Sequence, residues 1–232
     1  MSKIAIIAAM AGELKPLVRG WHRELSQGVD LWRWKFDQSE WVAACAGAGV
    51  QAATRAFAEA EKGGALDAVV STGWAGALRE ELLPGQICDV SCVIDARTGE
   101  RFLTAGPPSD CWLVTISLVA NVHEKQRLAS TYQASLVDME AAGVARLAQM
   151  RGIPFYCVKG ISDGFNDQLP DFNRFITANG QFMLGHFMVS RIYRPWQWPA
   201  LIRMGENSKK AAQGIAASLL DFLHERGRIR QP

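Results

Sequence analysis

The sequence predicts an α/β fold: a single domain with a mixed, largely parallel central sheet and flanking helices. Strand-like apolar runs alternate with helical segments along the 232 residues, as they do where helices connect the strands of one sheet. The β-branched residues of these runs show no polar alternation, which is typical of strands covered on both faces. No linker interrupts the pattern, so we expect residues 1–232 to form one domain.

The first half of the chain contains most of the expected strands. The expected strands there are 4–8, 41–46 and 68–72, with antiparallel or edge additions at 32–36 and 86–95. A helix is expected from about Gly12, directly after the first strand, and a second one over residues 51–62. Strands and helices that follow one another in this way favour crossover connections within one sheet.

The second half continues the same alternation. Residues 113–117 and 155–159 are expected strands, and the Ala-rich residues 141–150 are expected to form a helix between them. Small side chains allow that helix to pack closely on the sheet, and Gly152 is a suitable C-cap. Residues 165–188 are apolar and interrupted by glycines, and they predict no definite element.

Composition excludes several classes of protein. The chain has 25 basic and 23 acidic residues, which gives no electrostatic case for binding nucleic acid. Its five cysteines form an odd number without a C-x-x-C pair, so a reducing, cytoplasmic setting is expected. The four histidines have no ligand spacing, and no metal or cofactor is expected. No apolar run is long enough to span a membrane or to be a signal peptide.

Acidic residues and a glycine-containing segment follow the predicted strands. Glu13 comes after the first strand, Gly73, Trp74 and Ala75 lie in a small-residue loop after the strand at 68–72, and Asp163 follows the strand at 155–159. Each has an ordinary explanation, since acidic residues are common in first helical turns. The carboxyl ends of strands are nevertheless where open α/β sheets bind ligands. Together they predict a site.

Four motifs carry a resemblance to a known family. They are Ile-Ala-Ala-Met-x-x-Glu ending at residue 13, Ser-Thr-Gly-x-Ala-Gly at 71–76, Asp-Met-Glu-Ala at 138–141, and Gly-Ile-Ser-Asp at 160–163. Over about residues 3–165 the chain resembles the nucleoside phosphorylase and nucleosidase family, and most of all the methylthioadenosine/S-adenosylhomocysteine nucleosidases. The resemblance implies a mixed sheet with flanking helices and cleavage of the N-glycosidic bond of a purine nucleoside.

The resemblance also implies roles for individual residues. Glu140, with Met139, would hold the ribose hydroxyls, and Asp163, next to Ser162, would be the general acid that protonates N7 of adenine. Glu13 would be the base that activates water. The transition state would then resemble a ribosyl cation with a carboxylate on each side of the breaking bond, as in glycoside hydrolysis.

The chain departs from the family pattern near these residues. Lys159 stands where the relatives have Arg, and an ammonium group does not replace the planar guanidinium fork. Trp74 replaces a small polar residue and is expected to reshape the nucleophile pocket. The segment 100–117 is shorter than in the nucleosidases, so the adenine contact is placed only around three residues: Ser117, Leu118 and Val119.

The identity of the nucleophile stays open between water and phosphate. Glu13 favours water, because a carboxylate repels a phosphate dianion, which needs no base. If phosphate is used, Gly47, Gly49 and Lys159 are the residues expected to hold it, although the glycines have a simpler explanation as a tight strand-to-helix turn. The prediction is hydrolytic release of adenine from a 5′-substituted adenosine. The alternatives are phosphorolysis and a non-catalytic nucleoside-binding protein.

The C-terminal residues 190–232 form a Trp- and Arg-containing segment followed by an amphipathic helix. Residues 194–199 predict a break, and residues 208–226 carry the apolar stripe of that helix. Together with the departures above, this tail resembles the hopanoid-associated phosphorylase branch, thought to remove adenine from adenosylhopane. Apolar, Trp and Arg residues in 182–204 suit a peripheral membrane contact, an interface of a homodimer, or simply a packed pair of C-terminal helices. A membrane-surface scaffold is a third alternative function.

Overall fold

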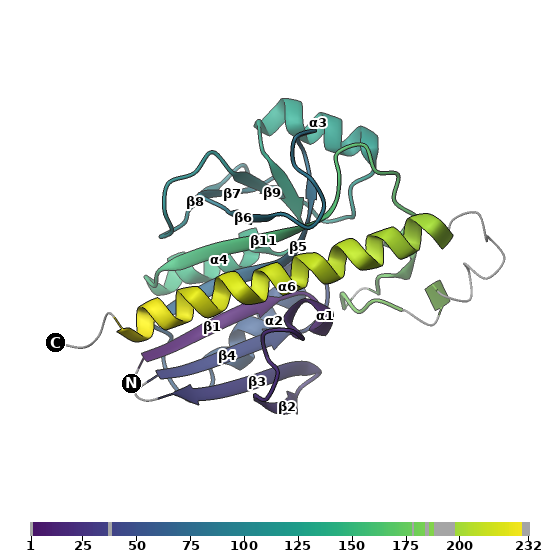
Figure 1. Cartoon of the computed structure of the whole chain (residues 1–232). Coiled ribbons are helices and arrows are strands. Elements are labelled where there is room, and N and C mark those ends of the chain that lie inside the picture. The colour runs from purple at the N-terminus through teal and green to yellow at the C-terminus, as the bar shows by residue number, and fades with distance from the viewer. Residues whose placement is uncertain (1, 37–38, 178, 184–185, 188–197, 229–232) are drawn as a thin grey trace.

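The structure, a computed structural model, describes residues 2–36, 39–177, 179–183, 186–187 and 198–228. Its strands are β1 (Ser2–Ala8), β2 (His22–Ser26), β3 (Val29–Phe36), β4 (Ser39–Cys45), β5 (Ala68–Ala77), β6 (Ile87–Asp89), β7 (Cys92–Asp95), β8 (Arg101–Leu103), β9 (Trp112–Thr115), β10 (Leu136–Asp138) and β11 (Phe155–Asp163). Its helices are α1 (Ala11–Leu14), α2 (Val50–Glu61), α3 (Val122–Tyr132), α4 (Ala141–Arg151), the 3₁₀ turn η1 (Asn173–Phe175) and α6 (Trp198–Arg228) (Figure 1).

These strands form one mixed sheet with helices around it. The order is β2-β3-β4-β1-β5-β10-β9-β7-β8, and β11 pairs with β5 and β6. The pairs of β1 with β4 and β5, of β5 with β11, and of β9 with β7 and β10 are parallel, whereas β3 pairs antiparallel with β2 and β4. The predicted α/β fold with a mixed central sheet is therefore confirmed.

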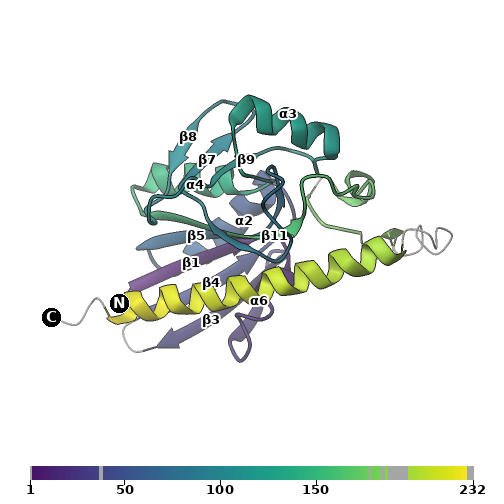
Figure 2. The ribbon, with the colours of Figure 1, turned by 45° about the horizontal axis from the view of Figure 1, so that its top comes forward.

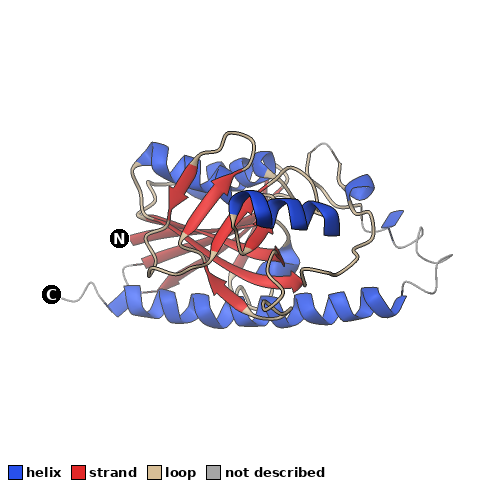
Figure 3. Cartoon of the chain, turned by 90° about the horizontal axis from the view of Figure 1, so that it is seen from above, coloured by secondary structure: helices blue, strands red, loops and turns tan. Residues whose placement is uncertain are grey.

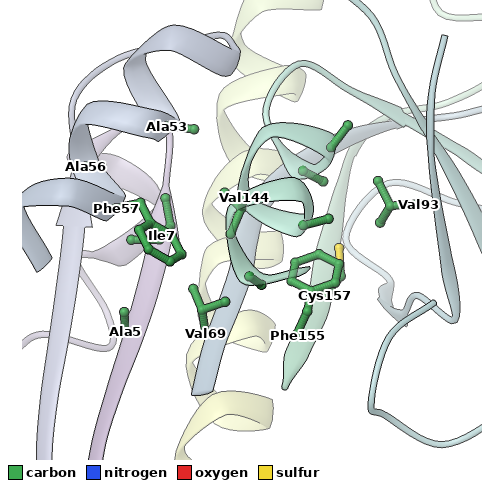
Figure 4. Packing of buried hydrophobic residues seen from close by; sticks show 14 of the residues in the cluster. Ala5, Ile7, Ala53, Ala56, Phe57, Val69, Val93, Val144, Phe155 and Cys157 are labelled. Carbon is green, nitrogen blue, oxygen red and sulfur yellow. The ribbon is translucent and has the colours of Figure 1, made fainter. Parts of the chain in front are cut away.

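The two faces of the sheet are covered by different helices. Because side chains alternate along a strand, Val69 and Cys157 pack on one face with α2 and α4, whereas Val70 and Val158 pack on the other face with α6. Figure 3 shows α6 along one side of the strands, and Figure 4 shows the first of these cores around Phe57. Burial on both faces explains why these strands lack polar alternation.

The long helix α6 lies close against β11. A Cβ atom at Gly160 would come within 2.8 Å of the Cβ of Ala211, so the absence of a side chain sets this close approach. In the views of Figures 1 and 2 the helix runs along the sheet in nearly the same direction as β1. Its amphipathic character, predicted for 208–226, is confirmed by the burial of Ala211, Ile215 and Leu219.

Strand β5 has an opening along one edge. Residues Ala68 to Ser71 pair there with β1, and Gly76 and Ala77 pair with β10 on that side. Among the described strands, none pairs with residues 72–75 on this edge, while β11 pairs with the opposite edge over its length. The chain reverses strand order at this point, which is where open α/β sheets form ligand sites.

Several predicted boundaries differ from the structure. Gly73, Trp74 and Ala75 were expected in a loop, but they belong to β5 because β11 continues beside them as far as Asp163. The helix expected from Gly12 is only the short α1, since Pro16 has no N–H to continue the helical hydrogen bonds. Helix α3, over 122–132, was not predicted.

The C-terminal helix also differs from its prediction. It begins at Trp198, before the expected start at residue 208, and Pro199 is tolerated in its first turn. Of the break predicted at 194–199, residues 198 and 199 belong to α6, and residues 194–197 lie outside the described residues.

A buried ion pair connects β11 with β10. Lys159 Nζ lies 2.9 Å from Asp138 Oδ2, and both residues are buried. Asp138 also accepts hydrogen bonds from Ala141 N–H, at 2.9 Å, and from the Thr115 hydroxyl, at 2.7 Å. Burial by itself lowers the pKa of Lys159, but the charge and hydrogen bond of Asp138, together with the smaller contributions of Cys157 and Glu140, outweigh burial and hold this pKa above its ordinary value. One carboxylate thus joins β9, β10, α4 and β11.

We predict that Lys159→Met destabilises the fold by about 3–5 kcal/mol, because it leaves the buried Asp138 carboxylate without its cation. Urea unfolding followed by circular dichroism measures this change. The double variant Lys159→Met/Asp138→Asn removes both charges and should lose less stability than the single variant. Wild-type stability in Lys159→Met would contradict a structural role for the pair.

Candidate active site

Glu13 fills the opening along the edge of β5. Its Oε1 atom accepts a hydrogen bond from Trp74 N–H at 2.8 Å, and its Oε2 atom accepts from Ala9 and Met10 N–H, each at 2.8 Å. Gly73 is required beside it: a Cβ there would lie 2.7 Å from Oε1, and the backbone has φ +122°. The carboxylate therefore takes the place of a missing strand partner.

The environment of Glu13 raises its affinity for a proton. The residue is 3% exposed. Burial raises the pKa of Glu13, while the N–H groups of Trp74 and Met10 and the charge of Lys159 act in the opposite direction. A carboxylate with a raised pKa is a stronger proton acceptor than an exposed one.

Glu140 lies at the N-terminus of α4, at the N-cap position directly before the predicted first turn. Its Oε1 atom accepts a hydrogen bond from Gly49 N–H at 2.7 Å, and Met139 N–H lies 3.3 Å from Oε2. Burial raises the pKa of Glu140 to about 8, with a further increase from the negative charge of Asp138 and opposing contributions from Lys159 and Gly49. The charge of Glu13 also raises it, so the two glutamates interact electrostatically.

Asp163 is the last residue of β11 and is held on both oxygens. Oδ1 accepts a hydrogen bond from the Ser162 hydroxyl at 2.5 Å, and Oδ2 accepts one from Lys125 Nζ at 2.5 Å. Gly76 leaves room for this arrangement, since a Cβ there would lie 3.0 Å from Oδ2. Gly73 and Gly76 are three residues apart, or about 10 Å of extended strand. Glu13 and Asp163 therefore contact the same strand at two points.

Lys125 was missed in the sequence because α3 was not predicted. The signal was present: Asn121 accepts a hydrogen bond from Glu124 N–H as the N-cap of α3, and Asn-x-x-Glu is a typical helix start. A helix beginning there places Lys125 and Leu128 three residues apart on one face. Both are buried. What no local pattern could indicate is that the lysine reaches a carboxylate at residue 163.

A cavity of about 800 Å³ opens beside Asp163. Its lining includes Ser162 and Asp163 at the end of β11, and apolar side chains from two other segments, among them Leu82, Leu83, Leu201 and Met204. Glu13 and Glu140 are not among the residues that line it. Of the three carboxyl groups, Asp163 is the one that lines this cavity.

The residues predicted to contact adenine lie in and after the loop that follows β9, and Trp74, predicted to reshape the nucleophile pocket, lies in β5. Ser117 and Leu118 are exposed in the loop after β9. The N–H and C=O groups of Val119 pair with the side-chain amide of Asn173, at 2.8 and 3.2 Å. The Trp74 indole points toward α6 and donates to the Ser208 carbonyl at 3.0 Å, so its backbone, and not its ring, serves Glu13.

The groups predicted to hold a phosphate are already hydrogen-bonded. The N–H groups of Gly47, Ala48 and Gly49 donate to Ala9 O, Gly180 O and Glu140 Oε1, at 2.9, 2.7 and 2.7 Å. Lys159 is paired with Asp138 and donates to Thr72 O at 3.2 Å. The glycine turn therefore connects the strand end to α2 and binds a carboxylate.

Within the described residues there is no group of three or more His, Cys, Asp or Glu side chains arranged to hold a metal ion. Among the described helices, none has the length and apolarity needed to cross a membrane.

Comparison with known structures shows where this fold recurs. The 5′-methylthioadenosine/S-adenosylhomocysteine nucleosidase of Helicobacter pylori superposes with a TM-score of 0.73 at 18% identity, over 97% of this chain and 98% of that one. Futalosine hydrolase of Helicobacter pylori gives 0.73 at 17%, over 97% and 98%. The 5′-methylthioadenosine nucleosidase of Arabidopsis thaliana gives 0.69 at 17%, over 96% of each chain. At these identities the likeness establishes the fold.

The family assignment rests on the sequence itself. None of the curated proteins compared matches this chain. The family model described as the phosphorylase superfamily matches residues 3–110 and 108–184, and so covers the strands and carboxylates described above. The chain therefore belongs to the phosphorylase superfamily, and the family resemblance seen in its motifs is confirmed.

Proposed function

We propose that this protein hydrolyses the N-glycosidic bond of a 5′-substituted adenosine and releases adenine. Its family membership makes it an enzyme that cleaves nucleosides. The observation that carries the finer proposal is the set of three buried carboxyl groups, Glu13, Glu140 and Asp163, around the open end of β5. Paired acids of this kind are the machinery of glycoside hydrolysis.

Each carboxyl group has a distinct task in this reaction. The bond between C1′ and N9 breaks with its electron pair passing to the base, and Asp163 gives a proton to N7, so that adenine leaves neutral. Water attacks C1′, and Glu13 takes its proton. Glu140 holds the ribose hydroxyls. The proton on Glu13 returns through solvent to Asp163, which completes the cycle.

Water is favoured over phosphate by the partners of the candidate anchors. A phosphate dianion needs free N–H groups or cations, but those of the turn at Gly47 and Gly49 are used, and Lys159 is neutralised by Asp138. The buried Glu13 and Glu140 lie in the same region, where burial already disfavours negative charge. Binding phosphate there would require breaking these contacts and overcoming repulsion.

The 5′ substituent is proposed to be apolar. The structurally similar proteins include enzymes named for 5′-methylthioadenosine, S-adenosylhomocysteine and futalosine, so this fold accepts different nucleosides. The cavity beside Asp163 has a mixed lining, and its apolar part, which includes Leu82, Leu201 and Met204, is the surface that a large apolar group would contact, as in the adenosylhopane hypothesis.

Membrane contact and the homodimer stay predictions. Residues 184–185 and 188–197 of the proposed membrane segment lie outside the described residues. In the part that is described, Phe187 is buried and packs against Phe172, Phe175 and Phe182, with ring centres 5.2–5.5 Å apart. These rings cover one another, which leaves Phe187 unavailable to a bilayer.

We predict that the purified protein releases adenine from 5′-methylthioadenosine and from a long-chain 5′-alkyl adenosine in buffer without phosphate. Chromatography of free adenine measures both reactions, and the ratio of their kcat/KM values reports the preferred substituent. Adding phosphate should leave the rate unchanged. Strict dependence on phosphate would replace hydrolysis by phosphorolysis, and tight binding without turnover would favour the nucleoside-binding alternative.

We predict that Asp163→Asn lowers kcat for adenine release by about 100-fold or more, because the amide has no proton to give to N7 at neutral pH. Steady-state kinetics measure this loss. Asp171→Asn, in the same loop region but exposed and paired with Arg174 on the surface, is the matched control and should retain wild-type kcat. Full activity in Asp163→Asn would exclude the proposed general acid.

We predict that the protein loses stability at alkaline pH because of Glu140. Its pKa is about 8 when folded and 4.5 as the ordinary value, so the folded state binds the proton more tightly and stability falls as pH rises through this interval. Between pH 6 and 9 the loss from this group is about 3 kcal/mol.

Glu140→Gln should flatten that decrease, since its amide keeps an oxygen for Gly49 N–H without acquiring charge. Urea unfolding at both pH values measures the difference, and the exposed Glu81→Gln variant is the control. A wild-type decrease that persists unchanged in Glu140→Gln would place the responsible group elsewhere.

A further inference from the structure

Lys125 is a buried cation beside the proposed general acid. It is 1% exposed, and its Nζ atom donates to Asp163 Oδ2 at 2.5 Å and to the Gly164 carbonyl at 2.6 Å. A fully buried lysine is rare unless it is paired, because an ammonium group that leaves water needs a counter-charge and hydrogen-bond acceptors to compensate for its lost hydration. The partner that explains the burial of Lys125 is therefore Asp163.

The surroundings of Lys125 are built to bring it to this carboxyl group. Asn121 is the N-cap of α3. The Lys125 side chain passes β5 at Gly76, which has no side chain: a Cβ there would lie 3.2 Å from Lys125 Cε and 3.0 Å from Asp163 Oδ2. With Gly164 O as a second acceptor, Nζ is fixed at one oxygen of Asp163. The other oxygen is held by the Ser162 hydroxyl.

We propose that Lys125 is a positioning residue for leaving-group protonation, an inference that rests on the proposed function. When the C1′–N9 bond breaks, the electron pair goes to the base and the Asp163 carboxyl proton goes to N7. Asp163 is left as a carboxylate, and the Lys125 ammonium neutralises the charge that has just formed. Lys125 keeps its own proton throughout and makes no contact with the base in this scheme.

This role differs from that of Lys159, the other fully buried lysine. Lys159 pairs with Asp138, which is bound to the N-terminus of α4 and to Thr115 and lies outside the lining of the cavity. The partner of Lys125 lines the cavity. In this scheme Lys125 neutralises the charge of Asp163, which changes during the reaction, whereas Lys159 neutralises the charge of Asp138, which does not change.

The test compares two leaving groups. Adenine needs a proton to leave, whereas 4-nitrophenolate, released from 4-nitrophenyl β-D-ribofuranoside, leaves as a stable anion. We expect Lys125→Met to lower kcat for adenine release from 5′-methylthioadenosine by about 100-fold and to change kcat for the nitrophenyl riboside by less than about 3-fold. Arg127→Met, on the exposed side of the same helix, is the control and should change neither rate.

A double-mutant cycle separates this role from a structural one. If Lys125 acts only through Asp163, then Asp163→Asn/Lys125→Met should have the same kcat for adenine release as Asp163→Asn alone. The double variant also avoids an unpaired buried charge, so it should fold even if Lys125→Met does not.

Equal losses on both substrates, or further loss in the double variant, would overturn the inference, as would an unaffected Lys125→Met enzyme, while the proposed function would stand. A wild-type protein that releases no adenine from either adenosine substrate would instead overturn the proposed function, and this role with it.

Discussion

Residues 72–75 of β5 lie between the segment that pairs with β1 and the segment that pairs with β10, and none of the described strands pairs with them on this edge. Buried backbone groups require partners, because an unpaired one costs as much as a lost hydrogen bond. Here side chains supply them: Glu13 accepts from Trp74 N–H, and Lys159 donates to Thr72 O. The opening in the sheet therefore selects a carboxylate and an ammonium group.

The same opening explains the electrostatics of the site. Glu13, Glu140 and Asp138 are buried close enough for their charges to act on one another and on Lys159. Burial raises the pKa of both glutamates, and for Glu140 the negative charges of Asp138 and Glu13 raise it further. A site that already resists negative charge disfavours the binding of a further anion.

Two fully buried lysines of this fold pair with carboxylates in different places. Lys159 lies at the middle of the sheet, where Asp138 joins four elements, and Lys125 reaches the rim, where Asp163 lines the cavity. Glycines of β5 leave the space that these side chains need: Gly73 leaves space for Glu13, and Gly76 leaves space for Lys125 and Asp163. The glycines of the Thr-Gly-x-Ala-Gly motif thus lie where side chains from other elements approach the strand, and a side chain at either position would collide with them.

The sequence by itself determined the fold class, the main strands and the family, because apolar periodicity and strand-end motifs are local and report burial directly. It also indicated Glu13, Glu140 and Asp163, since each follows a recognisable strand or begins a helix. It did not determine that residues 73–75 are strand, because only the continuation of β11 beside them makes them so.

The tertiary structure alone decided the partners. That Gly49 N–H binds Glu140, that Lys159 meets Asp138, and that Lys125 reaches Asp163 depend on residues separated by 91, 21 and 38 positions in the chain. Such contacts follow from strand order and helix placement, which no local pattern encodes. The carboxylates could be predicted from their own neighbourhoods, whereas the groups that set their charge could be found only in the folded chain.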